Sequence, residues 1–191
     1  MSDESTLRLR AAGFLISVLG GFLVALGSLM PWAEVLFGGT STVVGIDIGD
    51  GVITLVAGLA VIIAVLAMRV GKTMRARRGL AVVVIAGGVV AISIGIGVVS
   101  NAEEKFGLPV VQEKLEMISE QTGLPLEELI KQRNIPLEQV SLQAGVFVVI
   151  GGGVIGLIGG ALSMMWAARW KGWKQVEEDD EGAASGEDPP G

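Results

Sequence analysis

The sequence predicts an all-α membrane protein, a four-helix transmembrane bundle with a small helical extracytoplasmic cap between the third and fourth spans. The 191-residue chain is 51% apolar and has a mean hydropathy of +0.64, well above what a soluble globule needs. Its apolar residues are concentrated in four stretches without Asp, Glu, Lys or Arg. Each stretch has the roughly 17–25 residues with which a helix crosses a hydrocarbon core of ~30 Å.

We expect these stretches to be the membrane spans. The first could instead be a cleaved signal peptide, with Ala25 and Gly27 as a small-residue cleavage site. Its apolar run is longer than a usual signal core, so we favour an uncleaved helix. The expected parts are an N-terminus (1–10), span 1 (11–30), an outer loop (31–51), span 2 (52–68), a basic loop (69–79), span 3 (80–100), an amphipathic outer segment (101–143), span 4 (144–168) and a tail (169–191).

The basic residues predict how the chain is oriented in the membrane. The loop at 31–51 contains no Lys or Arg, whereas five bases lie within residues 69–78 and three within 169–174. Cytoplasmic loops carry the excess of Lys and Arg. We therefore expect a multi-pass protein of the bacterial inner (plasma) membrane with both termini in the cytoplasm. The tail is acidic and is expected to be disordered from about residue 175, because it lacks apolar periodicity.

The four tryptophans are expected at the membrane interfaces, where indole rings are enriched. Trp32 follows span 1 directly and marks its outer end. The other three are interleaved with the bases after span 4 and form an expected inner belt: Trp166, Trp170 and Trp173.

Glycines recur at every fourth position within the spans. Residues four apart share a helix face, so such rows make grooves where another backbone can approach closely. On span 4 the expected row has Gly156 at its centre and leaves Gly153 beside it. The grooves could serve the bundle itself or association between chains. The residues expected to pack are Gly13, Gly21, Gly87, Gly95, Gly152, Gly156 and Gly160.

Asp50 lies at the start of span 2 and has two interpretations. Its carboxylate can cap the helix, where it would satisfy free N–H groups and suit the helix dipole. With Glu34 and Asp47 it could also offer oxygen ligands to a cation such as calcium, although the spacing does not fit an EF-hand. We favour the helix cap and expect no metal site.

Pro31-Trp32 follows the first span directly, and Gly49-Asp50-Gly51 precedes the second. Through these residues the stretch 11–68 resembles a group of small uncharacterised actinobacterial membrane proteins, and the resemblance implies no established activity. The four-span topology is also similar to that of claudins and other tetraspan adhesion proteins. The paired cysteines of the first claudin loop are missing here, so that similarity is one of topology alone.

The outer segment at 101–143 is the one sizeable polar region outside the spans. Val111, Leu115 and Ile118 have helical spacing, and Gly123 is expected to end that helix. A second helix is expected to open at Pro125, and a third to run from Pro136 into span 4. The segment is expected to form a cap that rests on the bundle or on lipid headgroups, or to form a surface that binds a partner.

The chemistry-bearing residues argue against catalysis. The chain has no cysteine and no histidine, the spans have no ionisable residue, and no phosphate-binding or nucleophile motif occurs. Outer carboxylates such as Glu103, Glu104 and Glu113 lack a specific partner. We expect no enzyme, no catalytic residue, no cofactor and no nucleic-acid partner. The favoured function is a membrane scaffold or accessory protein that contacts the lipid bilayer, other membrane proteins or itself. The alternative is an oligomeric pore or small-molecule carrier with its path between subunits.

Overall fold

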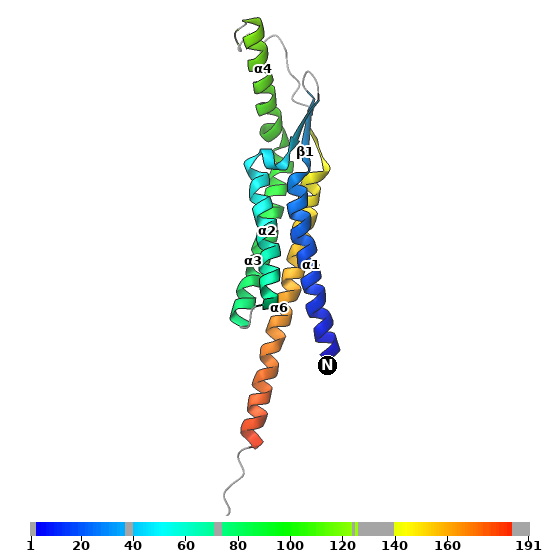
Figure 1. Ribbon diagram of the computed structural model, residues 1–191, viewed down its shortest axis with the longest axis vertical. Coiled ribbons are helices and arrows are strands. Elements are labelled where there is room, and N and C mark those ends of the chain that lie inside the picture. Colours follow the sequence, from blue (N-terminus) through cyan, green and yellow to red (C-terminus); the bar gives the residue numbers. More distant parts are fainter. Residues whose placement is uncertain (1–2, 37–39, 71–73, 124, 126–139, 185–191) are drawn as a thin grey trace, which may run out of the picture.

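Four long helices form the body of the protein, as the sequence predicts (Figure 1). The computed structural model describes residues 3–36, 40–70, 74–123, 125 and 140–184. Within each long helix lies a segment long and apolar enough to cross a membrane, which confirms the all-α membrane fold. The helices are α1 (Asp3–Leu29), α2 (Gly49–Val70), α3 (Met74–Ser100) and α6 (Ala144–Ala184). Their membrane-spanning segments are Ala11–Leu29, Gly49–Val70, Ala76–Ser100 and Ala144–Met165.

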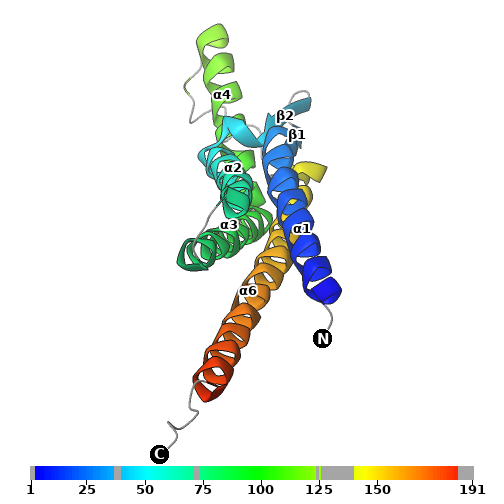
Figure 2. The ribbon, with the colours of Figure 1, turned by 60° about the horizontal axis from the view of Figure 1, so that its bottom comes forward.

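The helices pack as a ring in which chain neighbours are spatial neighbours. α2 packs between α1 and α3, and α6 returns to pack against both α3 and α1. The start of α1 and the end of α6 lie at the same end of the bundle (Figures 1 and 2). Large apolar side chains cover the outside, among them Leu15, Val56, Ile63 and Ile158. This outward apolar surface suits hydrocarbon, which is as apolar as these side chains.

A small antiparallel sheet covers one end of the bundle, which we call the cap end. The strand order is β2-β1-β3, so the central strand β1 pairs with a neighbour in sequence and with one from just before α6. Valine occurs in each strand and threonine twice in β2, and both residue types favour pleated structure. The strands are β1 (Pro31–Leu36), β2 (Thr40–Val44) and β3 (Val140–Leu142).

The sheet corrects two expectations from sequence. Residues 31–51 are not a plain loop, because they hold two strands, a 3-10 turn η1 (Gly45–Asp47) and the start of α2. The expected helix running from Pro136 into span 4 is wrong at residues 140–142, which form β3. The expected helix opening at Pro125 falls on residues 126–139, outside the described residues.

The third span continues beyond the bundle as a helical arm. After Ser100 the chain forms a short π-helix, η2 (Glu103–Gly107), and then α4 (Leu108–Thr122), which projects beyond the sheet (Figure 1). Gly123 ends α4 as expected, with a left-handed φ of 69° and its N–H donating to the Ser119 carbonyl at 2.8 Å. Glycine suits this position because it has no Cβ to clash there.

At the opposite end, α6 continues well past the other helices (Figure 2). It remains helical to Ala184, so the structure differs from the disorder expected from about residue 175; residues 185–191 lie outside the described part. This end also carries Arg8, Arg69, Arg77 and Arg78, and we call it the basic end. The bases lie where α1 and α3 begin and α2 ends.

The contact between α1 and α6 is the most extensive in the bundle, and small residues make it close. A methyl group added at Gly20 would lie 2.6 Å from the Gly156 Cα, and one added at Gly152 would lie 2.8 Å from the Val24 nitrogen. Such distances leave no room for a Cβ. The backbones therefore meet directly, and their dispersion contacts replace the hydrophobic drive that lipid does not supply.

The glycines at which an added methyl group would crowd the partner helix recur at intervals of seven in this contact. A helix turns about 100° per residue, so a step of four drifts about 40° and a step of seven only about 20° in the opposite sense. A row spaced by seven therefore stays on one face along the whole contact. The row on α1 is Gly13, Gly20 and Gly27, and the row on α6 is Gly145, Gly152 and Gly159.

We predict that Gly152→Ala destabilises the protein by about 1–3 kcal/mol, the usual cost of overpacking. The matched control is Gly151→Ala, because a methyl group there has nothing within 4 Å and the helix propensity gained is the same. Thermal unfolding in mild detergent measures both. A loss of stability in Gly151→Ala as large as in Gly152→Ala would contradict the observed contact.

Candidate functional site

The glycines expected to pack lie in four different interfaces. Gly13 faces Ser163 of α6, whereas Gly21 faces Val61 and Gly58 of α2. The glycine rows expected from fourfold spacing are therefore divided between neighbours, because each step of four rotates the face. Of the remaining expected residues, Gly87 of α3 faces α2, and Gly152 of α6 faces α1. Gly95 of α3 faces α6, and Gly160 of α6 faces α3.

Gly156 differs from its expected role. A methyl group added there meets nothing within 4 Å, although Gly20 approaches the Gly156 backbone from the other side. Gly153, expected to lie off the packing row, faces α3: a methyl group would lie 2.8 Å from Ile92 Cγ1 and 3.0 Å from the Gly88 carbonyl oxygen. Gly153 is therefore the more constrained of the two.

Trp32 joins the sheet to the bundle. Its side chain is fully buried, and its Nε1–H donates to the Gly27 carbonyl at 2.8 Å. The ring lies where methyl groups on Gly45 and Gly145 would clash with it, so both glycines make room for the indole. Trp32 follows the end of α1, where the sequence places the outer end of the first span, but its ring belongs to the core of the cap end and is not exposed on the surface.

Gln143 connects β3 to β1 by two hydrogen bonds. Its backbone N–H donates to the Trp32 carbonyl at 2.9 Å, and its Nε2 donates to Glu34 Oε2 at 2.9 Å. Together with the backbone bond from Gly45 to Met30, at 3.2 Å, these bonds fix the strands directly above α1 and α6. The hydrogen bond between Gln143 and Glu34 could not be predicted from local sequence pattern, because 109 positions separate the two residues.

Asp50 lies inside the first turn of α2 and forms an ion pair with Lys105 of η2. The cap interpretation is corrected in this respect: the carboxylate accepts from a side chain, while it still suits the positive end of the helix dipole. The carboxylate of Asp47 accepts instead from the Val44 N–H at 3.3 Å. This arrangement ties α2 to the helical arm.

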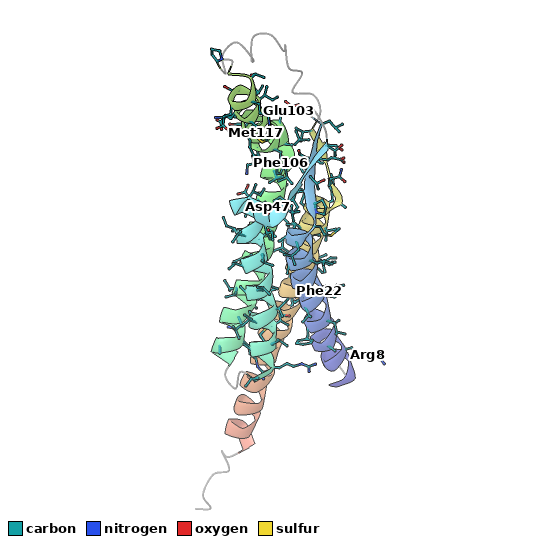
Figure 3. The ribbon with its side chains drawn as sticks, turned by 45° about the horizontal axis from the view of Figure 1, so that its top comes forward. Arg8, Phe22, Asp47, Glu103, Phe106 and Met117 are labelled. Carbon is teal, nitrogen blue, oxygen red and sulfur yellow. The ribbon has the colours of Figure 1, made fainter. Side chains whose placement is uncertain are left out.

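α4 presents an exposed acidic face at the cap end. Glu113, Glu116 and Glu120 are exposed at helical spacing, while Leu115 on another side is buried. Met117 lies among the acids with 49% of its surface exposed (Figure 3). A face of this kind has charge and one flexible apolar side chain, and the latter adapts well to partner surfaces.

The described residues offer little to chemistry. They hold no group of three acidic, histidine or cysteine side chains that could bind a metal. The interstice between the helices, which is lined mainly by glycines such as Gly20, Gly88 and Gly156, has no room for a water molecule. Inside α1 and α2, Ser28 Oγ and Thr54 Oγ1 bond to each other at 2.8 Å and to backbone carbonyls. The side chains of Trp166, Trp170 and Trp173 lie outside the described residues.

We predict that Trp32→Phe lowers the free energy of unfolding by about 1 kcal/mol through the lost bond to Gly27. Trp32→Ala should lower it by about 3–5 kcal/mol, because a cavity is added. Leu36→Ala, at an exposed position of the same strand, is the control and should change it by less than about 0.5 kcal/mol. Thermal unfolding in detergent measures the free energy of unfolding of all three variants. Equal small decreases would show that the indole does not stabilise the cap end.

Comparison with curated proteins finds no match for this chain. A family model described as Tryptophan-associated transmembrane protein matches residues 14–188, from within α1 through the cap and α6. The match covers far more of the chain than residues 11–68, on which the resemblance drawn from sequence rests. The chain therefore belongs to the family of tryptophan-associated transmembrane proteins.

Proposed function

We propose that this chain is a non-catalytic scaffold or accessory protein of the membrane, which acts through helix packing and through the outward face of its cap. The observation that carries the proposal is how the cap is built. The sheet is tied to α1 and α6 by Trp32 and Gln143, and the arm to α2 by Lys105. The sheet is thereby held in place above the bundle, and a pre-ordered surface of this kind is suited to docking, because little ordering entropy is lost on binding.

The closed interior supports the same proposal. The apolar parts of the four spans, residues 11–29, 52–68, 80–100 and 144–165, contain no ionisable residue, and such residues inside a membrane mark proton relays, ion paths and substrate sites. The glycine contacts bring the backbones together, and the interstice that Gly20, Gly88 and Gly156 line has no room for a water molecule. A pore or carrier path would therefore have to lie between copies of the chain, and this is the alternative function.

Purification of the full chain in mild detergent tests the proposal. We expect a particle heavier than the 19.7 kDa chain that contains a second kind of polypeptide. Reversing three charges on α4, by Glu113→Lys, Glu116→Lys and Glu120→Lys together, should release that partner without loss of thermal stability, because these side chains are exposed.

The matched control reverses three charges in the acidic part of α6, by Glu177→Lys, Glu178→Lys and Glu181→Lys, and should keep the partner bound. An assembly of identical copies alone would favour the pore or carrier. Since the family description associates its members with tryptophan, free tryptophan is the ligand to add to such an assembly. A monomer in every detergent would contradict both functions.

We also propose that the basic end faces the cytoplasm of a bacterial plasma membrane, since Lys and Arg are retained on that side. A reporter active only in the cytoplasm should work when fused after Gly191 and fail when inserted after Thr122 at the end of α4. Immunoblots that show comparable expression of the two fusion proteins are the control. Activity at Thr122 together with silence at Gly191 would reverse the orientation.

A further inference from the structure

The basic end combines arginines from three helices; α2 and α3 contribute no acid there, whereas α1 carries Asp3 and Glu4 in its first turn. Arg8 belongs to α1, Arg69 to α2, and Arg77 and Arg78 to α3 (Figure 3 labels Arg8). Between Asp50 and Glu103 the sequence contains no carboxylate at all. α3 also begins at this end, and its first turn adds the positive pole of a 27-residue helix. The end of the bundle formed by α2 and α3 therefore carries a positive potential without local compensation from those helices.

Arg69 is placed to donate to an anion. Its Cζ lies 4.2 Å from the centroid of the Phe14 ring, and its side chain is exposed. A cation–π contact orients the guanidinium without using its N–H donors. Phe14 in turn packs against the buried cluster of Val61, Ala64, Val65 and Val84. The guanidinium thus has a fixed position at the edge of the span and donors available for phosphate geometry.

The other three arginines already have interactions within the protein. Arg77 and Arg78 are half-buried, so their positions are restrained. They contribute positive charge near Arg69, and the hydrogen bond to the anion need not come from them.

An apolar surface runs directly up to this charge. Ile63, Leu66 and Val70 lie on the outward side of α2, with 65%, 52% and 80% of their surfaces exposed. An acyl chain can cover this strip while its headgroup phosphate lies at Arg69. A free phosphate ion would leave the strip uncovered, so the combination of features fits a lipid.

We propose that Arg69, held over Phe14, binds the phosphate of an anionic phospholipid at the basic end of α1, α2 and α3. Phosphatidylglycerol and phosphatidylcholine with the same acyl chains are the probes, added to the full chain in an uncharged detergent. We expect phosphatidylglycerol to bind more tightly and to raise the melting temperature more. Arg69→Gln should weaken it about fivefold, the factor for roughly 1 kcal/mol per base at an anionic surface, and leave phosphatidylcholine unchanged.

Lys131→Gln is the control, because it removes one positive charge from the segment between α4 and β3, both at the cap end. Inorganic phosphate should produce no comparable rise in melting temperature. Equal effects of the two lipids, an equal effect of inorganic phosphate, or equal behaviour of Arg69→Gln and Lys131→Gln would each overturn the proposal. If Arg69→Gln fails to fold, Phe14→Leu replaces it: this variant keeps the apolar volume, removes the ring, and should reduce the preference for phosphatidylglycerol. An unchanged preference would overturn the proposal as well.

Discussion

The direct contact between the backbones of α1 and α6 is the constraint on which the remaining structure depends. These helices are the first and last spans, and glycines spaced by seven let them approach until no Cβ fits between them. In lipid the gain comes from dispersion, which decays steeply with distance, so even one methyl group would forfeit contacts along the helix. α2 and α3 then pack against this pair and close the ring.

The cap follows from the same pairing. Since α1 ends beside the start of α6, β1 and β3 emerge next to each other and pair, although more than a hundred positions separate them. Trp32 fills the space above the two helix ends, and Gly27, Gly45 and Gly145 make room for its ring. The sheet is thus a consequence of helix packing, and it fixes a polar surface at one end of an otherwise apolar body.

The two ends of the bundle differ in charge, and this difference organises the proposed functions. At the cap end, the acids on α4 are exposed and Lys105 is paired with Asp50. At the basic end, α2 and α3 present arginines, and the one carboxylate of these two helices, Asp50, lies at the cap end. A protein-facing surface at one end and a lipid-phosphate site at the other use different chemistry, so each proposal can fail without the other. Their separation by a closed apolar bundle keeps the two surfaces independent.

The sequence alone determined the four spans, because length and the absence of charge are sufficient to require helices in a bilayer, where backbone polar groups must be satisfied internally. It also located the end of α4 at Gly123, where local backbone geometry needs no tertiary contact. The tertiary structure decided which helix each glycine faces, since a drift of about 40° per four residues divides a row between neighbours. It likewise decided the sheet, the burial of Trp32 and the Asp50–Lys105 pair, because each joins residues that meet only after the spans have packed.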